Sequence, residues 1–146
     1  MRTPILALVI AFSWLGINTG TASEKVWVGL YLAENAPPEA GTTAAPEKLR
    51  ESLREVFGFK NYVLIKSGEI KLRDRWEHWV VPRKDFFIRV EPLPWQPGEQ
   101  EVIDYEIYKD GFIVAKGQYE PHQDTPLFIN GPDFKKGRFV FVLEAR

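Results

Sequence analysis

The alternation of hydrophobic and polar positions predicts a strand over residues 25–32. In residues 25–32, every second side chain is Val or Leu, which is typical of a strand that packs one face against a core. Residues 33–45 contain two prolines, a glycine, two threonines and five alanines. Because this segment has almost no large apolar side chain, it predicts a flexible loop.

A helical pattern follows the loop over residues 46–57. Pro46 suits the first helical position, Glu47 suits the first turn, and Gly58 is a typical helix terminator. The apolar side chains that form one face lie at i, i+4, i+7 and i+8: Leu49, Leu53, Val56 and Phe57. The opposite face is charged, which indicates a solvated surface.

From Gly58 to the end of the chain, the pattern has a period of two. This predicts strands over residues 59–66, 69–73, 76–81, 86–93, 102–109, 112–119, 126–129 and 138–144. Pro92, Pro94 and Pro97 predict a rigid connection between two of these strands, because proline cannot donate a ladder hydrogen bond.

Two turns define hairpins in this half. Asp110-Gly111 tolerates the positive φ angles of a type I′ turn and predicts that Ile107 pairs with Val114. That register places Phe112 and Val114 on the same face as Ile103, Tyr105 and Ile107, which we expect to be core. Lys135-Lys136-Gly137 predicts a second hairpin that leads into the last strand. That strand is apolar on nearly both faces, so we expect it to be central.

These elements predict an α+β fold. One amphipathic helix packs against a mainly antiparallel sheet of six to eight strands, arranged as a sandwich or an open barrel. We expect residues 23–146 to form a single domain.

The first 22 residues read as a secretory signal peptide. Arg2 precedes an apolar run that begins at Ile5 and is shorter than the roughly 20 residues that span a bilayer. Small residues such as Ala22 then suit signal peptidase. We therefore expect an exported protein, periplasmic or extracellular, with no stable membrane span after processing. The alternative is an N-terminal membrane anchor.

Residues 46–146 resemble small exported bacterial proteins of uncharacterised function. The resemblance rests on the helix and its exit, Pro46 to Tyr62, and on the segment Asn130-Gly131-Pro132-Asp133-Phe134-Lys135-Lys136-Gly137-Arg138-Phe139. In those proteins, a helix that ends at an aromatic-glycine turn leads into a sheet closed by a Gly-Pro loop. The resemblance implies an exported location and a fold, and it implies no catalytic residue.

Charge and composition argue against several kinds of partner and site. The chain has 19 Lys and Arg against 20 Asp and Glu, so no strong positive field favours nucleic acid as a partner. There is no cysteine, and the two histidines, His78 and His122, lack the spacing of a metal pair. No glycine-rich phosphate loop or serine nucleophile elbow occurs. We therefore expect neither a metal nor a cofactor.

The segment 73–79 mixes acidic, basic and aromatic side chains. In a strand, Glu77 and His78 would point to opposite faces, which weakens their use as an acid-base pair. A small hydrolase could still use His78 with carboxylates among Asp74, Glu77, Glu91, Asp104 and Glu106. The other alternative is a purely structural component of the envelope.

Aromatic residues favour a binding role instead. We expect Trp76, Trp79 and Trp95, with His78, to contribute a binding surface, since exposed planar rings fit sugar faces or peptide side chains. Trp27 and Tyr31 lie opposite the core face of the first strand, and packing of Trp27 under the helix is as consistent with the pattern as exposure. The sequence therefore favours an exported, non-enzymatic module that contacts an envelope protein or a glycan through aromatic residues and a sheet edge.

Overall fold

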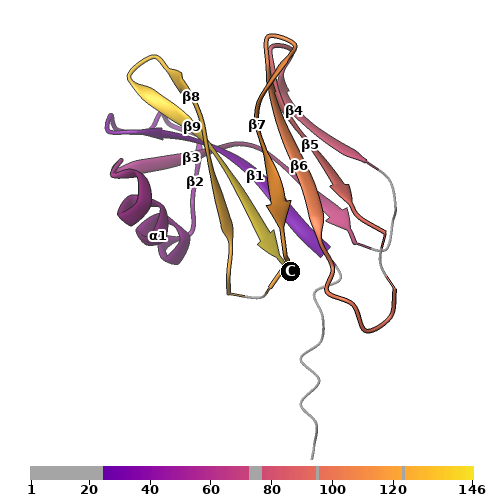
Figure 1. Ribbon diagram of the computed structural model, residues 1–146. Coiled ribbons are helices and arrows are strands. Elements are labelled where there is room, and N and C mark those ends of the chain that lie inside the picture. Colours follow the sequence, from indigo (N-terminus) through magenta and orange to yellow (C-terminus); the bar gives the residue numbers. More distant parts are fainter. Residues whose placement is uncertain (1–24, 73–76, 95, 123) are drawn as a thin grey trace, which may run out of the picture.

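The computed structural model describes residues 25–72, 77–94, 96–122 and 124–146. In these residues the chain forms one helix and nine strands (Figure 1). The predicted signal peptide, residues 1–22, lies outside the described part of the chain.

The first sheet has five strands in the order β2-β3-β1-β9-β8, and all its pairs are antiparallel. Its strands are β1 (Lys25–Glu34), β2 (Thr43–Ala44), β3 (Asn61–Lys71), β8 (Leu127–Phe134) and β9 (Gly137–Ala145). The last strand, β9, lies between β1 and β8, so the prediction that it is central is confirmed.

The second sheet has four strands in the order β4-β5-β6-β7, again with antiparallel pairs. They are β4 (His78–Arg83), β5 (Phe86–Pro92), β6 (Ile103–Lys109) and β7 (Phe112–Tyr119). The α+β class and the antiparallel pairing are thus confirmed. The predicted total of six to eight strands is too low, because nine strands form in the described part of the chain. Of the two predicted arrangements, the sandwich is the one observed, since the described strands form two sheets and do not close into a barrel.

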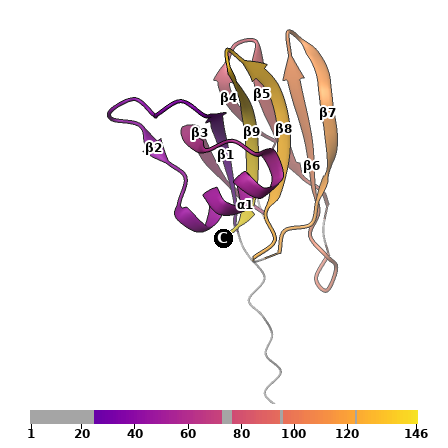
Figure 2. The ribbon, with the colours of Figure 1, turned by 90° about the vertical axis from the view of Figure 1, so that its left-hand side faces the viewer.

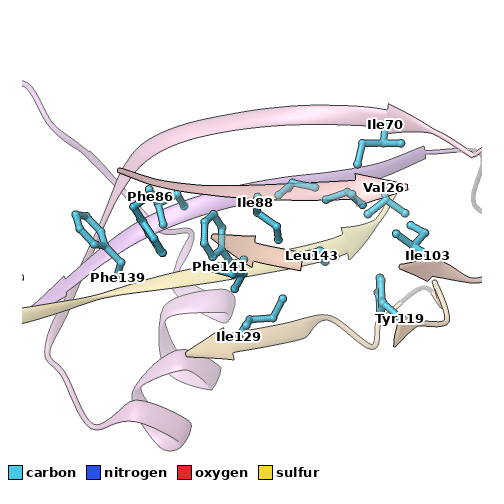
Figure 3. Close-up of a cluster of buried hydrophobic side chains, with 14 of the residues drawn as sticks. Val26, Ile70, Phe86, Ile88, Ile103, Tyr119, Ile129, Phe139, Phe141 and Leu143 are labelled. Atoms are coloured by element: carbon cyan, nitrogen blue, oxygen red, sulfur yellow. The ribbon is translucent and has the colours of Figure 1, made fainter. Parts of the chain in front are cut away.

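A core of apolar side chains fills the space between the two sheets (Figure 3). Phe141 of β9 is fully buried, and its ring centroid lies 5.3 Å from that of Phe86 on β5. Phe139 stacks on the same Phe86 ring at 5.4 Å. The other buried members are Val26, Val28, Leu30, Ile70, Leu72, Ile88, Val90, Ile103, Ile107, Tyr119, Ile129 and Leu143. These contacts join the sheets into a sandwich.

The helix α1 (Glu47–Phe57) covers the other face of the five-stranded sheet (Figures 1 and 2). Leu49 and Leu53 are buried in a second core that the sheet side chains complete. Gly58 ends the helix as predicted: its φ of 82° is left-handed, and its N–H donates to the Arg54 carbonyl at 2.9 Å. Val56 differs from the prediction, because 61% of its surface is exposed. It lies at the margin of the apolar stripe.

Trp27 packs in the layer between helix and sheet. Its indole is buried, and the Arg146 guanidinium lies 4.3 Å from the ring centroid. A Cβ at Gly29 would collide with this indole, so the glycine leaves room for the ring along β1. Of the two alternatives that the sequence allowed for Trp27, the structure has the buried one.

Three predicted boundaries change in the structure. Strand β1 continues to Glu34, and Thr43–Ala44 pairs with β3, which shortens the predicted loop over 33–45. Ala45 at its end is buried in the same cluster as Leu49 and Leu53 of the helix. The predicted strands 59–66 and 69–73 form one strand, β3, because Ser67 and Gly68 stay in register with β1.

The Asp110-Gly111 hairpin forms with positive φ at both residues, as its sequence predicts. The expected register is wrong beyond the turn, because a β-bulge follows Ile113 and Ile107 pairs with Ala115 instead of Val114. Val114 is the extra residue of the bulge and is 54% exposed. Phe112 pairs with Lys109 next to the turn and is 75% exposed there, so the expectation that it belongs to the core is wrong.

Candidate functional site

One broad surface of the molecule has no partner among the described elements. Along β5, buried residues alternate with partly exposed ones, so one set of side chains enters the core and the other faces away from it. No described helix or strand covers the second set, because α1 lies on the opposite side of the sandwich (Figure 1). We call this surface the outer face. Its residues are Glu77, Trp79, Phe87, Arg89, Glu91, Asp104, Glu106, Tyr108, Ile113, Lys116 and Gln118.

Three aromatic rings from three adjacent strands gather on the outer face. Phe87 and Tyr108 are directly opposite one another, and their rings stack with centroids 5.0 Å apart and an interplanar angle of 14°. Trp79 of β4 lies 5.2 Å from Phe87 and 5.9 Å from Tyr108. Trp79 nevertheless leaves 46% of its surface exposed. The cluster thus presents an indole to solvent on a base of packed rings.

An ion-pair network beside the rings is centred on Arg89. Its Nη1 lies 2.7 Å from Glu91 Oε2, and its Nε donates to Glu106 Oε2 at 3.0 Å. Glu77 lies 3.6 Å from the same Nη1. The Arg89 side chain is only 15% exposed, because neighbouring strands surround it with these carboxylates.

The network also fixes the aromatic cluster. The Tyr108 hydroxyl donates to Glu106 Oε2 at 2.6 Å, and Arg89 holds the same oxygen. These hydrogen bonds from Tyr108 and Arg89 keep the pKa of Glu106 below its usual range, and Glu106 in turn raises the pKa of Tyr108. The Tyr108 ring therefore has a defined position before any ligand binds.

The lowered pKa of Glu106 predicts a dependence of stability on pH. A carboxylate whose folded pKa is depressed contributes stability above its unfolded pKa, about 4.3, and loses it as the pH falls through the folded value. We expect Glu106→Gln to lower the free energy of unfolding at neutral pH, and we expect its difference from the wild-type value to disappear in acid. Urea denaturation of both proteins from neutral to acid pH would test this prediction. Parallel pH curves for the two proteins would contradict it, and Glu120→Gln, an exposed carboxylate outside the face, is the control.

Polar side chains continue the outer face beyond the rings. Glu106 is opposite Lys116, and Asp104 is opposite both Glu91 and Gln118. A hollow of about 410 Å³ lies along β6 and β7. Its lining residues are Asp104, Tyr105, Glu106, Lys116, Gly117 and Gln118. Carboxylate, ammonium and amide groups thus lie next to the aromatic cluster on one continuous sheet surface.

The structure separates the predicted binding residues. Trp79 is on the outer face, as described above. His78 is opposite Val90, a core residue, and no described group forms a hydrogen bond with its buried Nε2 atom. His78 therefore lies on the core side and does not join Trp79. Trp76 and Trp95 lie outside the described residues.

The carboxylates considered for a hydrolase lie close together on the open surface. Glu77, Glu91 and Glu106 surround Arg89, and Asp104 faces Glu91 across the strands. Glycosidases need one carboxyl group that stays protonated as a general acid. The pKa of Glu106 is shifted in the opposite direction, which suits this residue to ion pairing rather than proton donation. Asp74 lies outside the described residues.

A second hollow, of about 350 Å³, lies between the first turns of α1 and the β7–β8 connection. His122 and Asp124 line it from the connection, and Ser52 lines it from the helix. The Ser52 hydroxyl donates to the Lys48 carbonyl at 3.2 Å, and His122 is exposed, 3.9 Å from Glu120. The hollow thus brings together polar groups that no described contact arranges as a nucleophile and its base.

The edge of the second sheet is apolar near the hairpin turn. Strand β7 pairs with β6 alone, so its other side is free among the described strands. Phe112, Ile113 and Val114 are all exposed there, and Lys116 is the only charged residue of the strand. Such an edge could pair with a strand of another protein.

The ring cluster contains two residues that the sequence interpretation missed, Phe87 and Tyr108. The signal was present, because alternation in 86–93 and 102–109 leaves these rings opposite the core-facing side chains. Arg89, Glu91 and Glu106 follow the same alternation. Their convergence with Trp79 depends on strand order, which local patterns do not specify.

The described residues contain no group of three or more His, Cys, Asp or Glu placed to hold a metal ion, and no helix long and apolar enough to cross a bilayer. Comparisons of the chain with protein-family models, with curated proteins and with solved structures gave no match.

Proposed function

We propose that this protein is an exported, non-enzymatic binding module that holds a glycan of the cell envelope on its outer face. The observation that carries the proposal is the placement of the Trp79, Phe87 and Tyr108 rings beside a row of hydrogen-bonding side chains. A sugar ring combines apolar C–H faces with a rim of hydroxyl groups. An exposed indole matches the first, and carboxylate, amide and ammonium groups match the second.

The shape of the surface supports a polymer over a small substrate. The face spans four strands, about 14 Å at the usual strand spacing, and it is open along its length. An elongated ligand can lie across the strands and contact rings and polar groups together. The hydrogen bond that the Tyr108 hydroxyl donates to Glu106 also favours binding, because a ring that is already ordered loses less entropy on association.

Replacement of Trp79 tests the proposal. We expect Trp79→Ala to weaken binding to polysaccharides of envelope type by about tenfold or more, because a central aromatic side chain commonly contributes most of the interface energy. Affinity electrophoresis through gels that contain chitosan, a soluble β-glucan or alginate would measure the loss. Thermal unfolding of the variant would show that the fold is retained.

Phe112→Ala is the matched control, because it removes an exposed ring from β7 and leaves the outer face intact. Unchanged binding by Phe112→Ala, with loss in Trp79→Ala, supports the proposal. Loss of glycan binding in Phe112→Ala, with unchanged binding by Trp79→Ala, would instead assign binding to the β7 edge. Binding to a protein partner that only Phe112→Ala abolishes would assign it to the same edge. Failure of the wild type to bind any glycan would overturn the proposal.

A further inference from the structure

The charge of the outer face restricts which glycans it can accept. Its described residues include four carboxylates, Glu77, Glu91, Asp104 and Glu106, and two cations, Arg89 and Lys116, a net charge of −2. The whole chain has a net charge of only −1, with both signs spread along the sequence. Negative charge is therefore concentrated on the surface that bears the aromatic cluster.

The cations of this face are already engaged by its carboxylates. Arg89 contacts Glu91, Glu106 and Glu77, and little of its side chain is exposed. Lys116 is opposite Glu106, and its charge contributes to lowering the pKa of that carboxyl group. An anionic polymer would have to compete with these internal pairs and would meet uncompensated carboxylates.

Asp104 stands apart from this network. It is directly opposite Glu91 across β5 and β6, and like charges in that position repel each other. In the described part of the chain no ion pair involves Asp104, and its nearest partner on β7 in register is the neutral Gln118. Asp104 also lines the 410 Å³ hollow. A cationic group of a ligand in this hollow would relieve the repulsion and gain an ion pair.

The rings favour the same kind of ligand charge. An ammonium group within about 6 Å of an aromatic centroid is attracted to the ring face. Trp79 provides such a face next to the row of carboxylates. A sugar that bears an amino group can therefore stack on the indole and pair with a carboxylate in one binding mode.

From this charge complementarity we propose that the glycan held by the outer face is an amino polysaccharide, with protonated amines that pair with Asp104 and its neighbours. The inference rests on the proposed function and narrows its ligand class. A peptide rich in lysine or arginine would share the charge, but protein interfaces rely on anchors inserted in pockets. The open, shallow outer face is better matched to a flat sugar chain.

Matched oligosaccharides test the inference. Isothermal titration of the purified protein would compare hexamers of β-linked glucosamine, N-acetylglucosamine and glucose, at a pH where amines are protonated and carboxylates ionised. We expect the glucosamine hexamer to bind about tenfold or more tightly than either neutral hexamer. Raising the ionic strength from about 0.1 to 1 M shortens the Debye length from about 10 to 3 Å and should remove most of this preference.

Variants separate this inference from the proposed function. Asp104→Asn should weaken binding of the glucosamine hexamer about two- to fivefold, the usual range for one exposed ion pair, and leave the neutral hexamers unaffected. Glu120→Gln makes the same change of charge outside the face and should change nothing. Trp79→Ala should weaken every hexamer that binds.

Each remaining outcome has a defined meaning. Equal binding of all three hexamers, lost in Trp79→Ala, would overturn the amino-sugar inference and leave the glycan proposal standing. Binding of no hexamer would overturn both. Tighter binding of hexalysine than of the glucosamine hexamer, with the same dependence on Trp79, would show that the face binds a basic peptide.

Discussion

Replacement of Phe141 by alanine should lower the free energy of unfolding by about 3–5 kcal/mol. Phe141 is fully buried between the two sheets, where it packs against Phe86 from the opposite sheet. Loss of the ring removes buried apolar area and leaves a cavity that rigid strands on both sides cannot fill. Because β9 also pairs with both β1 and β8, the strand that carries Phe141 has little freedom to move inward.

Equilibrium denaturation in urea would measure this loss. Phe112→Ala is the matched control, since it deletes the same side chain from an exposed position and should change stability by about 0.5 kcal/mol or less. A loss below about 1 kcal/mol for Phe141→Ala would contradict the packing described here. It would indicate that the sheets close over the vacated space.

We expect the second large effect from Leu53→Ala, which should lower the free energy of unfolding by about 2–5 kcal/mol. Leu53 is fully buried and, with Leu49, attaches α1 to the five-stranded sheet. Its backbone carbonyl accepts a hydrogen bond from the buried Tyr62 hydroxyl at 2.9 Å, so α1 and β3 are joined at the same residue. Alanine favours helix, so the loss would come from packing and not from helix propensity.

Val56→Ala is the control on the same helix, because Val56 is exposed and its replacement keeps the helix intact. We expect Val56→Ala to be neutral or slightly stabilising. Hydrogen exchange would add a local measurement, since amides of α1 should lose protection in Leu53→Ala before those of β9. Equal stability of the two variants would contradict the proposed role of Leu53.

The helix and the hairpins were predictable because their signals are local. Pro46 and Gly58 mark the ends of one helix through their own backbone preferences, and Asp110-Gly111 specifies a turn in the same way. The last strand was recognisable as central because it is apolar on both faces. The structure shows why both faces are apolar: Phe141 faces the other sheet, and Val140 faces the helix layer.

The assignment of strands to the two sheets was not predictable from alternation. A period of two identifies a strand and its faces, but not the strand that pairs with it. The bulge at Val114 has no marker in the sequence, and it changed the expected partner of Ile107. Alternation specifies neither the sheet to which a strand belongs nor the position of a bulge.

The candidate site was found in part for the same reason. Trp79 was recognisable as an exposed aromatic residue within a charged segment. Its neighbours Phe87, Tyr108 and Arg89 come from two further strands, and only the order β4-β5-β6 brings them together. His78 was predicted to bind together with Trp79, but these adjacent residues of β4 point to opposite faces of the sheet.

The two ends of the described domain meet in the sheet. The Lys25 N–H donates to the Arg146 carbonyl at 3.2 Å, and the Arg146 N–H donates to the Lys25 carbonyl at 2.8 Å. A few added residues could therefore link these ends, and a circular permutant opened in the segment 35–42 should keep every pairing of β1 and β9. Cargo fused at either end would leave the molecule at the same place, where β1 begins and β9 ends.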